Sequence, residues 1–161
     1  MKKFNLKKTV SLACMAVLME FAAAVPVNAG LTVEAVDTQI GFDCDMSQGN
    51  VCIRKSLNGA PVYCIEPAVH RSEEDVYENT DLKDYTDLSD EAKERIAEYS
   101  YFGYGYAGHN DDEDYDASQY LVWAQTAPEF VKDMHFYDLS DHSLSKDDVI
   151  LQRAQRILDD V

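Results

Sequence analysis

Val62-Tyr63-Cys64-Ile65-Glu66-Pro67 is the stretch of sequence around which the rest of the chain is organised. Its β-branched and aromatic residues favour a strand, and Pro67 ends that strand because proline cannot donate to a β-ladder. Asn58-Gly59 separates this stretch from a second β-rich run, residues 51–57. Asn-Gly is the strongest short hairpin signal, since both central positions of a type I′ turn require positive φ. The sequence therefore predicts a β-hairpin over residues 51–66, with Cys64 inside its second strand.

Residues 1–29 are predicted to form a signal peptide. Four lysines (Lys2, Lys3, Lys7 and Lys8) precede an apolar run over residues 9–27, and Val27-Asn28-Ala29 offers small residues for cleavage before Gly30. The run contains Glu20 and Pro26, so a membrane anchor fits it less well. We expect a secreted protein, held at the cell surface if the full-length protein carries an anchor.

The predicted hairpin register assigns different roles to the cysteines. Pairing Leu57 with Ala60 places Cys64 opposite Ile53, and alternation of side chains then turns Cys52 and Cys64 to opposite faces. These two thiols could not bond without breaking the hairpin. Cys44, in a predicted polar loop over residues 43–50, is the expected disulfide partner of Cys52. Cys64 is left unpaired, which in an exported chain indicates intermolecular pairing or a reactive thiol.

The charge of the chain limits its partners. Thirty acidic residues against 14 Lys and Arg give a formal net charge of -16, and loss of the lysine-rich residues 1–29 would make it more acidic. Such a charge disfavours nucleic acid and anionic membranes, and it favours cationic partners as well as solubility. The acidic loop at residues 109–114 lacks the glycine and spacing of an EF-hand, so no metal site is predicted there.

Three helices are predicted after residue 87. The first has apolar residues at steps of three and four from Leu88 to Gly103 and begins at Ser89 as N-cap. The second covers residues 116–127, with Asp116 as N-cap and Gln119 at the N3 position of a capping box. The third is capped near Ser145 and has one apolar face: Ile150, Ala154, Ile157, Leu158 and Val161.

Three motifs together resemble the thioester domains (TQXA type) of Gram-positive cell-surface adhesins. They are Tyr63-Cys64-Ile65-Glu66-Pro67, the glycine and aromatic stretch ending in Tyr104-Gly105-Tyr106, and Ser118-Gln119-Tyr120-Leu121-Val122-Trp123. The resemblance implies an internal thioester between Cys64 and Gln119 that reacts once with an amine of a host or extracellular-matrix protein, or with a small amine. It implies no cofactor and no enzymatic turnover.

The chemistry of these residue types is consistent with that implication. A cysteine thiolate that attacks a glutamine amide expels ammonia and stores an activated acyl group. In the predicted capping box, the Gln119 carbonyl accepts the Asp116 N–H, a backbone donor of the kind that stabilises an oxyanion. Tyr63, Tyr120 and Trp123 are expected to keep water away from the ester, although aromatic residues at helical spacing are also typical of a core.

Two other classes of function stay open at this point. One is a Cys/His amide hydrolase in which His70, His109, His135 or His142 serves Cys64 as base. The other is a non-covalent secreted binding module in which Cys64 is a small buried hydrophobe.

The expected architecture is α+β, with a β-sheet or sandwich portion carrying Cys64 packed against a small helical portion carrying Gln119, and the thioester at their junction. Residues 30–161 are assigned to the thioester domain. Because no stalk or wall-sorting signal follows Val161, the domain is expected to be truncated at its C-terminus, with cell-wall attachment not encoded in this chain.

Overall fold

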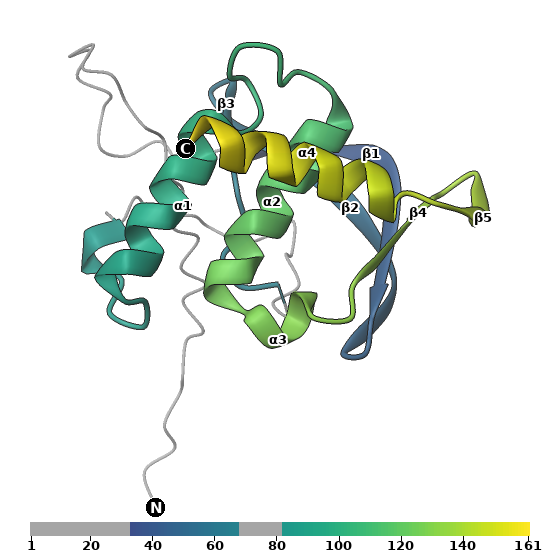
Figure 1. The fold of residues 1–161 in the computed structure, drawn as a ribbon, viewed down its shortest axis with the longest axis horizontal. Coiled ribbons are helices and arrows are strands. Elements are labelled where there is room, and N and C mark those ends of the chain that lie inside the picture. Colours follow the sequence, from purple (N-terminus) through teal and green to yellow (C-terminus); the bar gives the residue numbers. More distant parts are fainter. Residues whose placement is uncertain (1–32, 68–81) are drawn as a thin grey trace, which may run out of the picture.

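The computed structural model describes residues 33–67 and 82–161, which form an α+β fold (Figure 1). Five antiparallel strands make one sheet in the order β3-β2-β1-β4-β5. The strands are β1 (Val33–Cys44), β2 (Ser47–Leu57), β3 (Ala60–Val62), β4 (His135–Asp138) and β5 (Asp141–Ser145). The helices are α1 (Asp90–Phe102), α2 (Asp112–Thr126), α3 (Pro128–Val131) and α4 (Asp147–Asp160), after a short 3-10 turn at Leu82–Asp84. The predicted signal peptide, residues 1–29, lies outside the described residues.

The predicted hairpin around Asn58-Gly59 is confirmed. Both residues have positive φ, 53° at Asn58 and 81° at Gly59, and Leu57 pairs with Ala60. The second strand is shorter than predicted, because β3 ends at Val62. Cys64 therefore lies in the segment that follows the strand, residues 63–67, which we call the Cys64 segment.

The predicted loop at residues 43–50 and the predicted Cys44–Cys52 disulfide were both wrong. β1 runs to Cys44 and β2 begins at Ser47, so the two strands form a second hairpin in which Cys44 pairs with Ser47. Cys52 lies five residues further along β2, about 16 Å of extended strand, whereas bridged cysteines have Cα atoms within about 7 Å. Cys44, Cys52 and Cys64 are all free thiols.

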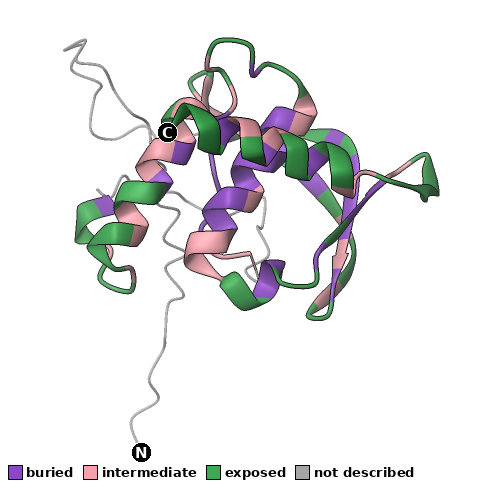
Figure 2. Cartoon of the chain, viewed as in Figure 1, coloured by how far each residue is buried: buried purple, intermediate pink, exposed green. Residues whose placement is uncertain are grey.

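The first and last predicted helices are confirmed, and the middle one begins earlier than predicted. Ser89 caps α1, where its hydroxyl accepts the Ala92 N–H at 3.1 Å. The capping box of α2 is formed by Asp111 and Asp114, so the assignment of Asp116 as N-cap and Gln119 as N3 was wrong. Both residues lie inside the helix. The predicted inner face of α4 is buried at Ile150, Ala154 and Ile157, whereas Leu158 and Val161 are exposed (Figure 2).

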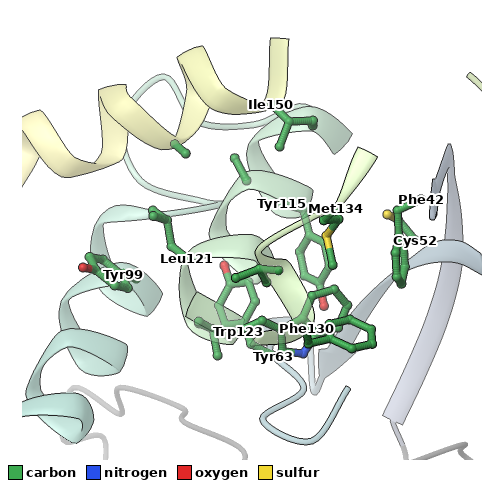
Figure 3. Close-up of a cluster of buried hydrophobic side chains, with 14 of the residues drawn as sticks. Phe42, Cys52, Tyr63, Tyr99, Tyr115, Leu121, Trp123, Phe130, Met134 and Ile150 are labelled. Carbon is green, nitrogen blue, oxygen red and sulfur yellow. The ribbon is translucent and has the colours of Figure 1, made fainter. Parts of the chain in front are cut away.

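Helix α2 occupies the centre of the fold, where it contacts β1 and β2 as well as α1 and α4. Its buried residues run from Asp114 to Trp123, which is unusual for a sequence so rich in polar residues. Trp123 packs against Phe42 of β1 and Phe130 of α3, with ring centroids 5.6 and 5.5 Å apart (Figure 3). The polar residues of α2 are consequently held against the sheet.

Within residues 33–67 and 82–161, no helix combines the length and the apolar character needed to cross a membrane.

Candidate functional site

A tyrosine from α2 separates the Cys64 segment from the sheet. The Tyr115 hydroxyl accepts the Lys55 N–H at 3.0 Å and donates to the Val62 carbonyl oxygen at 2.7 Å. Lys55 and Val62 form the pair of the β2–β3 ladder that lies farthest from the turn. Because the hydroxyl bridges the two backbones, the chain leaves β2 after Val62 and turns toward α2.

The Gln119 side chain then takes the place of a neighbouring strand. Its Oε1 accepts the Cys64 N–H at 2.7 Å, and its Nε2 donates to the Cys64 carbonyl oxygen at 2.8 Å. One amide thus exchanges both hydrogen bonds with one backbone residue, as in a hydrogen-bonded antiparallel pair. The structure therefore brings together the two residues that the sequence motifs singled out, 55 positions apart in the chain.

This geometry polarises the Gln119 carbonyl. The Cys64 N–H points at the oxygen that would carry negative charge if a nucleophile added to the amide carbon, which is how oxyanion holes work. The donor is the Cys64 N–H rather than the Asp116 N–H expected from the sequence. The Cys64 thiol is half-buried and donates to the Glu66 carbonyl oxygen at 3.3 Å.

A pocket of about 360 Å³ lies where the Cys64 segment, β2 and α2 meet. Cys64 and Gln119 both line it, so the two residues border space that a small molecule or a side chain can enter. Cys52, Lys55, Tyr115, Asp116 and Trp123 also line the pocket, with Phe42, Gly49, Asn50, Val51, Ile53, Pro67 and Phe136.

Asp116 is an acid buried in the wall of this pocket, with 2 % of its surface exposed. Its Oδ2 lies 2.8 Å from the Thr38 hydroxyl of β1. Burial raises the pKa of Asp116 to about 8, and the neighbouring carboxylates of Asp112 and Glu113 act in the same direction. Burial and the adjacent Asp116 likewise raise the pKa of the Cys52 thiol.

The three aromatic residues expected to shield the site have different positions. Tyr63 is buried and stacks on Tyr115 with a centroid distance of 5.2 Å, and burial raises the pKa of its phenol. Trp123 lines the pocket. Tyr120 packs instead against Phe136, 6.0 Å between centroids. Trp123 and Tyr115 thus line the pocket from α2, and Tyr63 stacks on the Tyr115 ring; all three are labelled in Figure 3.

The histidines that the structure describes lie away from the pocket lining. His109 is buried, with Nδ1 2.6 Å from the Phe102 carbonyl oxygen. His135 contacts Asp147, and the ring of His142 lies against Tyr137. His70 falls outside the described residues. In the same two ranges, no group of three or more His, Cys, Asp or Glu side chains is arranged to hold a metal ion.

Sequence reasoning missed Tyr115, Thr38 and Lys55 as members of this site. Tyr115 carries a weak signal, since it immediately precedes the predicted helix, residues 116–127, that contains Gln119. Thr38 and Lys55 carry none, because only the pairing of β1 and β2 within the fold brings Thr38 against Asp116 and Lys55 to the pocket.

Comparisons with protein-family models, with curated proteins and with solved structures found no match to this chain.

Proposed function

We propose that this protein is a secreted or surface-exposed adhesin module that binds host or matrix proteins covalently, through a Cys64–Gln119 thioester attacked by a target amine. One observation carries the proposal: the Gln119 amide is held against Cys64 by two hydrogen bonds, of 2.7 and 2.8 Å, at the edge of a pocket. The motifs around both residues and the predicted signal peptide support it.

The proposed reaction has two balanced steps. In the first, the Cys64 sulfur adds to the Gln119 amide carbon, the C–N bond breaks, and the thiol proton leaves with the nitrogen as ammonia. In the second, a primary amine adds to the thioester carbon and the C–S bond breaks. Gln119 becomes a substituted amide, and Cys64 regains a proton as a free thiol.

A lysine side chain is the proposed target group. Its ammonium is attracted to a strongly acidic surface, and its thin, flexible stem suits a pocket of about 360 Å³. The negative field has an opposing effect, since nearby carboxylates raise the pKa of an amine and reduce the fraction that is free to attack.

The two alternatives differ in what they require of Cys64. A non-covalent binding module needs only that the Gln119 amide satisfies the Cys64 backbone, which the same two hydrogen bonds achieve without chemistry. A Cys/His hydrolase needs a histidine beside Cys64, and none of His109, His135 and His142 lines the pocket. A chemical test on the purified protein separates the classes.

Intact-mass spectrometry of folded protein is that test. The wild type is expected to be lighter than its sequence by one ammonia, with no correction for a disulfide because Cys44 and Cys52 are free. It should then add methylamine and expose one further alkylatable thiol, because aminolysis releases Cys64. Cys64→Ala should have the full sequence mass and add no amine.

Lys55 calls for a matched control. It lines the same pocket, and an isopeptide bond between Lys55 and Gln119 would also release one ammonia. Lys55→Arg keeps the charge and removes the nucleophile, so it should behave as the wild type does. Freshly prepared, folded wild type at its full sequence mass would refute the thioester and leave the non-covalent module.

A further inference from the structure

Thr38, Cys52 and Asp116 form a hydrogen-bonded group at the pocket, in which Cys52 and Asp116 line the pocket and Thr38 lies behind them. The Thr38 side chain is buried, with 3 % of its surface exposed. Its Oγ1 lies 3.2 Å from the Cys52 carbonyl oxygen and 2.8 Å from Asp116 Oδ2. A hydroxyl has one hydrogen, and a carbonyl oxygen can only accept. The contact with Asp116 is the shorter of the two, so the Thr38 hydroxyl donates to Asp116 Oδ2 and holds that carboxyl group in the pocket wall.

The hydrogen bond from Thr38 favours the carboxylate, but burial outweighs it and raises the pKa of Asp116. On its own helix it faces the acidic Asp112 and Glu113 and the phenol of Tyr115. From β2 it faces the Cys52 thiol, and Lys55 lies in the same pocket. The nearby Arg54 is directed to Asp112, 3.3 Å away. Asp116 thus forms no ion pair with a described residue, and burial keeps it neutral up to a pH of about 8.

Asp116 is also well placed relative to the reacting residues. It lies three positions before Gln119 on α2, so the two side chains project from one face of the helix, and both line the pocket opposite Cys64. An amide nitrogen is a poor leaving group unless it is protonated, so a neutral acid next to the site supplies what thioester formation lacks.

We propose that Asp116 is the acid–base group of the Cys64–Gln119 reaction, passing its proton to the Gln119 nitrogen as ammonia leaves. The inference rests on the proposed function. As the C–N bond breaks, the Asp116 proton moves to the nitrogen, directly or through one water molecule, and the resulting carboxylate takes the proton of the Cys64 thiol. Asp116 ends the step neutral. In aminolysis the transfers run in reverse, with the amine proton reaching the carboxylate and the acid proton reaching sulfur.

The test compares Asp116→Asn with wild type and with Asp148→Asn. The asparagine carbonyl oxygen still accepts from Thr38, but the amide cannot transfer a proton, so the variant should fold and form the thioester about 100-fold more slowly, a typical loss for an acid–base group. Intact mass followed over time measures this. Asp148 is exposed in the first turn of α4 and does not line the pocket, so Asp148→Asn makes the same chemical change away from the site and should form the thioester at the wild-type rate.

The pH dependence of wild-type aminolysis is a second readout that a purely structural role would not produce. Hydroxylamine is the probe, because it stays unprotonated across the neutral range. Since Asp116 starts the step neutral, the rate should fall as the pH rises through about 8. This readout also serves if Asp116→Asn does not fold.

The outcomes separate the two proposals. Ammonia loss in the wild type with equal rates in Asp116→Asn and no fall in rate above pH 8 would overturn the role of Asp116 and leave the thioester intact. Absence of ammonia loss in the wild type would overturn both. Slow thioester formation in Asp116→Asn but not in the control variant, together with an aminolysis rate that falls above pH 8, would support both proposals.

Discussion

Replacing Gln119 with glutamate is expected to abolish amine incorporation and to destabilise the fold by about 2–4 kcal/mol at neutral pH. A carboxylate is not an acyl donor without activation, so no thioester forms. The stability loss comes from the backbone contact, because Nε2 donates to the Cys64 carbonyl oxygen and glutamate would place a second acceptor there. Gln119 is only 6 % exposed, so little water reaches the two facing oxygens.

The pH dependence of this loss has a definite sign. Burial against a carbonyl oxygen raises the folded-state pKa of the introduced glutamate above its unfolded value, since the protonated acid can donate to Cys64. Stability is therefore regained as the pH falls through the folded pKa and lost as it rises. Urea unfolding at pH 5 and pH 7 measures the difference, and Gln125→Glu, half-buried on the same helix, is the control. Equal losses in the two variants would contradict the assigned contact.

Replacing Tyr115 with phenylalanine is expected to cost about 2 kcal/mol and to slow thioester formation. The ring is fully buried and would stay, but the Lys55 N–H and the Val62 carbonyl oxygen would lose their shared partner. The two backbones could then close into one more ladder bond. This extension of β3 would draw Cys64 toward Ile53 and away from Gln119.

Denaturant unfolding and the rate of ammonia loss measure the two effects of Tyr115→Phe. Tyr101→Phe is the control, because the Tyr101 side chain is exposed and its ring lies against those of Phe102 and Tyr106, away from the pocket lining. If Tyr115→Phe lost stability but formed the ester at the wild-type rate, the hydroxyl would matter for folding and not for placing Cys64.

The features that were predicted correctly from the sequence depend on residues close together in the chain, such as turns and helix caps. Asn58-Gly59 predicts its hairpin because the turn needs positive φ at both residues, and Ser89 predicts the start of α1 because its hydroxyl caps the helix. The start of α2 was misplaced because five acidic or amide residues precede Tyr115, and several of them can cap a helix. Periodicity does not distinguish among these caps.

The cysteine argument failed for a different reason. It assumed that residues 43–50 form a loop that brings Cys44 near Cys52, whereas two-residue turns let both strands extend and separate the thiols. Counting cysteines therefore does not distinguish Cys64, since Cys44 and Cys52 are free as well. Cys64 is distinguished instead by its two hydrogen bonds with Gln119. Thr38 and Tyr115 could not be assigned beforehand, because their contacts join elements that are remote in sequence.

The span of 55 positions between Cys64 and Gln119 has a consequence for the unfolded chain. A covalent link across such a loop removes conformational entropy from the denatured ensemble, which in the chain-entropy model amounts to about 4 kcal/mol for a loop of this length. Attack by an amine opens that loop. After an amine has cleaved the proposed thioester, the protein would unfold more readily than the form with an intact thioester. Unfolding midpoints before and after methylamine treatment would measure this difference.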